Sequence, residues 1–284
     1  MSTAAATSGR LVLRGGRPLA GSVSVRGAKN ALPKIMVASL LTGEECTLRN
    51  VADVADVAIV SELIEAIGGR VERPERGVIR ILPAGVQPME RNVLREFSGR
   101  SRIPILTCGP LLARFGDAPV PSLGGCRIGQ RPVDFHLNAL QHMGATLHEE
   151  AGASHLTCER LQGAKIKLEF PSVGATEQVI LAAVRAEGVT ELSNAAIEPE
   201  IMDLIMVLQK MGAYISVDVD RVITIVGVRE LHGFDHTALP DRLEAASWAC
   251  AAVSTNGRIF VGGARQVDMM TFLNKYRQIG GDFK

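Results

Sequence analysis

The spacing of apolar residues predicts four helices of similar length along the chain. In the stretch NALPKIMVASLLTG, apolar side chains recur every three to four residues, which gives a helix one buried face. Three more stretches carry an apolar helix that ends at a glycine, a residue that suits a left-handed helix cap; they read RIPILTCGPLLARFG, GATEQVILAAVRAEG and DRLEAASWACAAVSTNG. A second helix follows each of the four and ends in EAIGG, QHMGA, QKMGA or RQIGG.

Two ladders of glycines indicate that this pattern is an internal repeat. The first helices close at Gly43, Gly116, Gly188 and Gly257, at intervals of 73, 72 and 69 residues. The second helices close at Gly68, Gly144, Gly212 and Gly280, at intervals of 76, 68 and 68 residues. Because two independent ladders have nearly the same step, we predict four copies of one structural module.

Short β-like runs fill the gaps between these helices. They include ECTLRNV, VTELSNA and RIFVGGA between the paired helices, and RVE, VIRIL, AYISVDV and RVITIVG after the second helices. Each module therefore reads β–α–β–α–β–β, which predicts an α/β fold. Solenoid repeats run to roughly 20–45 residues, so these longer modules are expected to close into a compact globule. The fourth module reaches Lys284 without trailing strands, and we expect the sequence to be part of a longer protein.

Composition narrows the functional classes. The 284 residues carry a net charge of +1, whereas a broad nucleic-acid surface needs a clear basic excess. No run of 18 apolar residues is present, so no membrane span is predicted. The five cysteines are scattered and odd in number, which favours free thiols and a cytoplasmic location. Residues 1–9 are small and polar, and we expect a disordered tail there.

The starts of the four first helices share a chemical character. The residues there are Lys29 with Asn30, then Arg102, then Ser172, Val173 and Gly174, and finally Asp241 with Arg242. Helix N-termini attract anions, and most of these starts add a cation. If the modules pack symmetrically, the starts converge on a cleft for a ligand with several phosphates or carboxylates. Each start taken alone is better explained by capping, because Asn30 and Asp241 are good N-cap residues, and only the convergence of several starts makes a ligand site an equal explanation.

The stretch SLGGCRIGQRPVDFH sets one cysteine among glycines and arginines. Nearby arginines favour a reactive thiolate at Cys126, and the glycines permit a loop that moves. The alternative is a tolerated surface thiol. Cys46, Cys108 and Cys250 lie in apolar strand or helix segments, and we interpret them as core residues. The histidines show no zinc-site spacing, and no Walker-type loop is present, so no metal or cofactor is predicted.

Six stretches together resemble one family, the UDP-N-acetylglucosamine 1-carboxyvinyltransferases, which are enolpyruvyl transferases. They are GAKNALPK, CGPLLARFG, GGCRIGQRPVDFH, PSVGATE, NAAIEPEI and LPDRLEA. The resemblance implies two inside-out α/β barrel domains of three β–α–β–α–β–β units each, with the active site between them. Residues 29–230 would form one complete domain that carries the cysteine loop. Residues 1–28 and 231–284 would form part of the second, incomplete domain.

The resemblance also implies a role for each candidate residue. Cys126 matches the catalytic cysteine, which serves as a general acid or as a covalent nucleophile. Lys29 and Asn30 match residues that bind phosphoenolpyruvate and the acceptor sugar. The positions that match the UDP-sugar site are Arg102, Arg131, Pro132, Val133, Asp134, Phe135, Ser172, Val173 and Gly174.

The reaction implied is transfer of the enolpyruvyl group to UDP-N-acetylglucosamine with release of phosphate, the first step of peptidoglycan precursor synthesis. Two alternatives stay open: another acceptor, such as a uridine nucleotide or shikimate 3-phosphate, and a non-catalytic relative that binds UDP-sugar. Two departures from the family pattern stand out. Ile103 and Pro104 replace a small residue and serine, and the family's acid/base aspartate and C-terminal arginines have no counterpart here. We therefore expect the 284-residue chain to turn over poorly.

Overall fold

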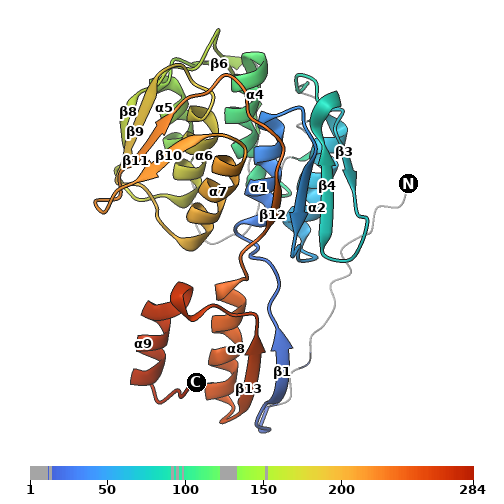
Figure 1. Cartoon of the computed structure of the whole chain (residues 1–284), viewed down its shortest axis with the longest axis vertical. Coiled ribbons are helices and arrows are strands. Elements are labelled where there is room, and N and C mark those ends of the chain that lie inside the picture. Colours follow the sequence, from blue (N-terminus) through green and yellow to red (C-terminus); the bar gives the residue numbers. More distant parts are fainter. Residues whose placement is uncertain are drawn as a thin grey trace. The chain divides into compact units, whose positions relative to one another are not determined.

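The computed structural model describes residues 12, 15–90, 93, 96–97, 99–121, 133–150 and 153–284. The expected tail at residues 1–9 lies outside this part of the chain. The chain divides into two compact units (Figure 1). The larger unit spans Arg26–Asp241, and the smaller unit combines Met1–Val25 with Arg242–Lys284.

The larger unit follows the predicted repeat. Its helices are α1 (Leu32–Ala38) with the 3-10 turn η1 (Ser39–Leu41), α2 (Ala55–Ala66), the 3-10 helices η2 (Pro83–Gly85) and η3 (Ile103–Thr107), α4 (Cys108–Phe115), α5 (Asp134–His142), α6 (Val173–Ala183) and α7 (Pro199–Lys210). Its strands are β2 (Cys46–Arg49), β3 (Arg70–Glu72), β4 (Val78–Leu82), β5 (Asp117–Val120), β6 (Thr146–Glu150), β7 (Ala153–Thr157), β8 (Lys165–Lys167), β9 (Val189–Ser193), β10 (Tyr214–Val217), β11 (Ile223–Val226) and β12 (Asp235–Thr237).

The strands form three separate sheets, one for each module of this unit. The strand orders are β12-β2-β4-β3, β5-β7-β6 and β10-β11-β9-β8. The pairs β12–β2 and β8–β9 are parallel, and the other pairs are antiparallel. Because β12 pairs with β2, the larger unit extends to Asp241, beyond the expected boundary at residue 230.

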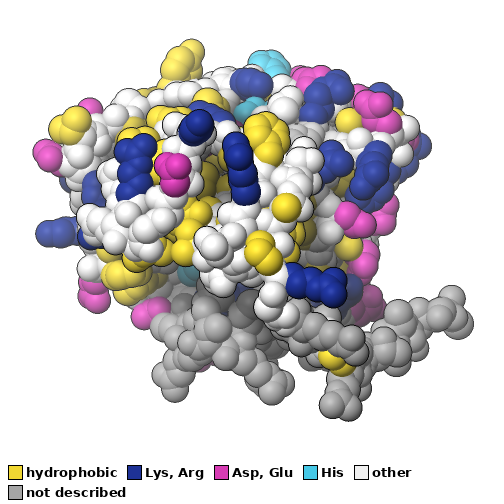
Figure 2. Space-filling model, turned by 90° about the horizontal axis from the view of Figure 1, so that it is seen from below, with side chains coloured by type: hydrophobic (Ala, Val, Ile, Leu, Met, Phe, Trp, Pro, Cys, Tyr) yellow, Lys and Arg dark blue, Asp and Glu magenta, His cyan; other side chains and the backbone are white. Residues whose placement is uncertain are grey.

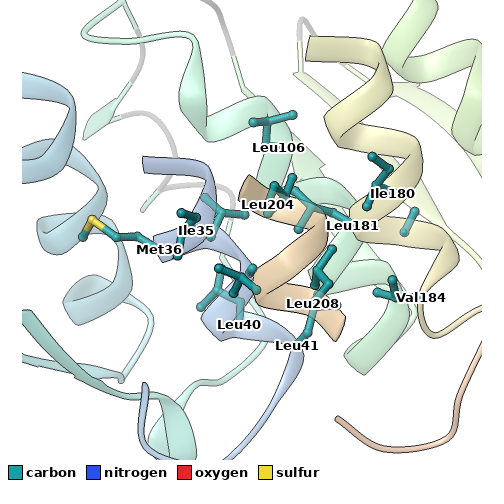
Figure 3. Packing of buried hydrophobic residues seen from close by; sticks show 14 of the residues in the cluster. Ile35, Met36, Leu40, Leu41, Leu106, Ile180, Leu181, Val184, Leu204 and Leu208 are labelled. Atoms are coloured by element: carbon teal, nitrogen blue, oxygen red, sulfur yellow. The ribbon is translucent and has the colours of Figure 1, made fainter. Parts of the chain in front are cut away.

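The helices fill the interior of the larger unit and the sheets lie outside them (Figure 1). All seven residues of α1 are buried, and so are nine of the eleven residues of α6. Strand β9 alternates between exposed and buried positions, as expected for a sheet with one face toward water. Figure 3 shows how leucines and isoleucines of α1, η3, α6 and α7 meet in the shared core. The predicted inside-out α/β arrangement is therefore confirmed.

The smaller unit has a much smaller core. Its elements are β1 (Ala20–Ser24), α8 (Arg242–Ser254), β13 (Arg258–Gly262), the 3-10 turn η4 (Gln266–Met269) and α9 (Met270–Gln278). Strands β1 and β13 pair in parallel. Among its described residues, the buried apolar side chains are Val25, Ala245, Met269, Leu273 and Tyr276.

Two local expectations need correction. The predicted left-handed glycine is present at Gly116 and Gly188, but Gly43 and Gly257 do not have a positive φ. Cys250 is exposed, although Cys46 and Cys108 are buried as predicted. The reason is the poor cover of α8, of which only Ala245 is buried. All four glycines that close the second helices have a positive φ.

The surface carries charges of both signs. On the face in Figure 2, lysine and arginine side chains are interspersed with aspartate and glutamate, as the net charge of +1 suggests. In the described part of the chain, we find no helix with the length and apolar character needed to cross a membrane.

Candidate functional site

The first candidate residue, Lys29, is held by two aspartates of the larger unit. Its backbone N–H donates a hydrogen bond to Asp241 Oδ2 at 3.0 Å. Its ammonium group lies 3.5 Å from Asp56 Oδ2, at the start of α2, and its side chain remains 52% exposed. The lysine is thus oriented by a carboxylate while it stays open to a ligand.

Asp56 connects Lys29 to the start of the second module. The hydroxyl of Ser101 donates to Asp56 Oδ1 at 2.6 Å. The same hydroxyl accepts the backbone N–H of Ile103 at 3.2 Å, so Ser101 satisfies one N–H at the start of η3, whose N-cap is Arg102. Pro104 sits in the first turn of η3, where a missing N–H costs nothing. The departure at Ile103 and Pro104 therefore leaves the helix start intact.

His136 connects Arg102 to the start of α6. A Cβ atom on Gly174 would lie 3.0 Å from both Cε1 and Nε2 of the His136 ring, so a glycine lets the two segments meet. His136 is buried and hydrogen-bonds Gln178, one turn along α6. Arg102 is close enough to interact electrostatically with the imidazole.

Burial decides the charge of this histidine. Desolvation lowers the pKa of His136 to about 4, and the positive charge of Arg102 acts in the same direction. The hydrogen bond to Gln178 and the charge of Asp134 oppose the shift. The imidazole is neutral at pH 7, and its Nδ1 has no partner among the described residues.

The other predicted residues divide between described and undescribed positions. Ser172 is the N-cap of α6, and its hydroxyl accepts the N–H of Ala175 at 3.3 Å. The N-cap of α1 is Ala31 rather than Asn30, so the expected capping role of Asn30 is wrong. Val133 and Asp134 begin α5 and Phe135 follows them, but Cys126, Arg131 and Pro132 lie outside the described residues.

Sequence reasoning missed the residues that link the candidates. Asp56, Ser101 and His136 each touch a predicted residue or lie close to it. His136 directly follows the motif RPVDF, and Ser101 directly precedes Arg102. Their positions next to candidate residues in the sequence could have indicated both. Asp56 lies far from both in sequence, and only the packing of α2 against η3 brings it there.

The arrangement suits an anionic ligand. Lys29 pairs with Asp56, which accepts a hydrogen bond from Ser101 next to Arg102 in the chain. His136 packs against Gly174 and lies within electrostatic range of Arg102, in the same unit. The cationic groups of Lys29 and Arg102, with the positive end of the helix dipole at the start of α6, can neutralise phosphate or carboxylate charge. The described residues contain no cluster of three or more metal-ligating side chains.

Comparison with known proteins defines the class of protein. The family model of EPSP synthase (3-phosphoshikimate 1-carboxyvinyltransferase) matches residues 13–284. The chain therefore belongs to this family of carboxyvinyl transferases. Solved enolpyruvyl transferases share the fold: NikO of Streptomyces tendae has a TM-score of 0.72 at 24% identity, and covers 83% of this chain and 56% of its own. EPSP synthase from Acinetobacter baumannii has a TM-score of 0.63 at 20% identity, and covers 82% of this chain and 53% of its own.

Two curated relatives with higher sequence identity share one name. The UDP-N-acetylglucosamine 1-carboxyvinyltransferase of Protochlamydia amoebophila is 47% identical over 280 residues, 96% of this chain and 60% of the relative. The enzyme of the same name from Chlamydia abortus is 46% identical over 95% of this chain and 61% of the relative. The chain thus spans about 60% of the length of these curated relatives.

Proposed function

We propose that this chain acts in the transfer of the enolpyruvyl group from phosphoenolpyruvate to the 3-hydroxyl of UDP-N-acetylglucosamine. The observation that carries the proposal is the linkage of Lys29, Arg102 and Gly174 through Asp56, Ser101 and His136. Relatives at 46% and 47% identity bear the name of this activity, which supports the same acceptor. The reaction would supply a peptidoglycan precursor.

The chemistry assigns each group a task. The sugar hydroxyl gives its proton to a base as its oxygen bonds to C2 of phosphoenolpyruvate, and C3 gains a proton as the C2=C3 double bond becomes single, which gives a tetrahedral intermediate. The C2–O bond to phosphate then breaks and C3 loses a proton, so the vinyl ether forms as phosphate leaves. In this proposal Lys29 and Asn30 hold phosphoenolpyruvate and the acceptor sugar, and Cys126 acts as a general acid or as a covalent nucleophile.

The UDP part of the substrate is assigned to a second set of residues. Arg102 and the start of α6 at Ser172, Val173 and Gly174 would hold its phosphates, because helix-start N–H groups and a guanidinium favour anions. Arg131 to Phe135 would hold the uridine end. Neutral His136 would pack beside Gly174 and keep this segment in place.

A phosphate-release assay tests the proposal. We expect slow release by the 284-residue chain that depends on UDP-N-acetylglucosamine and is lost in Cys126→Ala. Equal or faster release with shikimate 3-phosphate as the acceptor would contradict the choice of acceptor. Fosfomycin, an epoxide phosphonate that mimics phosphoenolpyruvate, should alkylate Cys126 when UDP-N-acetylglucosamine is present. Intact-mass analysis that finds no adduct there would count against the role of the cysteine.

A further inference from the structure

A buried ion pair lies behind the candidate site. Lys34 in α1 and Glu177 in α6 are 7% and 2% exposed, and the Lys34 ammonium lies 3.5 Å from Glu177 Oε1. Lysine and glutamate are rarely buried in this way unless they are paired, because removing each charge from water is costly. A hydrophobic pair would fill the same space, so this pair calls for an explanation other than packing.

The pair connects the two helix starts that carry candidate residues. The Lys34 ammonium also donates to the backbone carbonyl of Asn30, one turn back. Glu177 follows the Ser172–Gly174 segment by one turn of α6. A continuous path thus runs from Asn30 through Lys34 and Glu177 to the start of α6. The Lys34 contact holds the carbonyl of Asn30, in a turn where Asp241 already accepts the backbone N–H of Lys29.

The surroundings of Glu177 make the contact with Lys34 important. Burial raises the pKa of Glu177 to about 7, and the charges of Glu200 and Glu198 at the start of α7 act in the same direction. Lys34 from α1 opposes this shift through its charge and a hydrogen bond. From α5, His136 reaches the neighbouring Gln178. Without Lys34, Glu177 would lose the partner that favours its charged form, and its carboxyl group would stay protonated near neutral pH.

We propose that Lys34 and Glu177 form a positioning pair that fixes the Lys29–Asn30 turn relative to the start of α6. Neither residue is assigned a contact with substrate, so the pair acts through the candidate residues. This inference rests on the proposed function for its effect on ligand affinity. Its structural part, the coupling of two segments, does not depend on the ligand.

The first test reads the coupling directly by NMR of the 15N-labelled 284-residue chain between pH 5 and 9. We expect the amide signals of Lys29, Asn30 and Gly174 to shift together as Glu177 titrates. His136, beside Gly174, titrates below this range because burial lowers its pKa to about 4. In Glu177→Gln the shared transition should vanish from both segments. Its persistence, or its presence in one segment only, would overturn the coupling.

The second test reads affinity for UDP-N-acetylglucosamine in variants that remain folded by thermal melting. Lys34→Met and Glu177→Gln should each weaken binding by about ten- to a hundredfold, because small displacements of binding groups are costly. The double variant should recover part of this loss, since it leaves no unpaired buried charge. Lys165→Met, which breaks the exposed pair with Glu191 at 4.0 Å, is the matched control and should bind normally.

The two tests separate the possible failures. If the parent chain does not bind the nucleotide sugar, the proposed function fails while the NMR titration still decides the coupling. If the coupling is present but both single variants bind as the parent does, the pair only stabilises the fold. That result would overturn the positioning role.

Discussion

Helices α6 and α8 hold the same place in the repeat but have different surroundings. Nine of the eleven residues of α6 are buried, whereas Ala245 alone is buried among the thirteen of α8. When the closing glycines Gly188 and Gly257 are aligned, Leu181 of the buried helix corresponds to Cys250 of the exposed one. The same local pattern thus yields a core helix only where other helices pack around it.

This difference makes the larger unit the more stable scaffold. The core of the larger unit draws on all three of its modules, while the described residues of the smaller unit bury five apolar side chains. Since buried apolar area supplies most of the stabilising free energy, the smaller unit should open more readily. The single tryptophan, Trp248, lies in α8 and reports on the smaller unit alone.

The largest contrast is expected in thiol reactivity. Cys108 is fully buried, and burial raises the pKa of its thiol to about 12, whereas Cys250 is exposed. We expect Cys250 to react with iodoacetamide at least about a thousandfold faster, because Cys108 reacts only when the core opens. Peptide mass spectrometry resolves each site. Similar rates at the two cysteines would show that the larger unit has no protected core.

Truncation of aligned residues should separate the units next. Leu181→Ala should destabilise the larger unit by about 2–5 kcal/mol, because it leaves a cavity in a close-packed core. Cys250→Ala should change stability by less than about 0.5 kcal/mol. Urea unfolding followed by far-UV circular dichroism and by Trp248 fluorescence distinguishes the two units. A Leu181→Ala variant that shifts only the fluorescence transition would refute the placement of Leu181 in the core of the larger unit.

The pH dependence of the larger unit should reflect two opposing groups. Folding lowers the pKa of His136 from 6.5 to about 4. Between pH 4 and 6.5 the unfolded chain therefore binds one proton more than the folded chain, and the free energy of unfolding rises with pH. Folding raises the pKa of Glu177 from 4.5 to about 7. Between pH 4.5 and 7 the folded chain therefore binds one proton more than the unfolded chain, and the free energy of unfolding falls with pH.

Single substitutions should expose each contribution. Between pH 4.5 and 6.5, Glu177→Gln should make stability rise with pH, and His136→Asn should make it fall, by about 1 kcal/mol per pH unit in each case. Urea midpoints measured across this range check the slopes. The same slope in both variants would mean that one of the two groups has an ordinary pKa.

The smallest effects concern local backbone strain, which should not differ between the units. Gly212 and Gly280 close equivalent helices with φ of 101° and 89°. Gly212→Ala and Gly280→Ala should each cost about 1 kcal/mol, because a side chain disfavours this backbone region. Gly43→Ala, at a position without positive φ, should be neutral. Unequal costs at Gly212 and Gly280 would mean that tertiary packing, not backbone conformation, controls these sites.

The sequence predicted local features better than tertiary ones. The glycine ladders and apolar periods located the paired helices and most strands, because these features depend on residues close in sequence. Strand β5, with proline in DAPV, was not identified, since it is short and its pairing with β7 is a tertiary feature. The exposure of Cys250 was likewise missed, because an apolar helix does not reveal how many neighbours cover it.

The candidate site shows the same limit. The motifs indicated Lys29, Arg102 and Gly174, but the residues that join them were not predicted. Asp56 reaches Lys29 because α2 packs near the start of α1, and Lys34 meets Glu177 across a distance of more than a hundred residues in sequence. Such contacts follow from packing rather than from spacing along the chain.

One measurement tests the central claim that residues from three modules form one site in the larger unit. The 15N-labelled chain is titrated with UDP-N-acetylglucosamine and the amide signals of each unit are followed. We predict concerted shifts at Lys29, Arg102 and Gly174 with one dissociation constant, and none at Phe260 or Ile279. Shifts with unrelated dissociation constants at the three residues, or shifts confined to the smaller unit, would contradict the account.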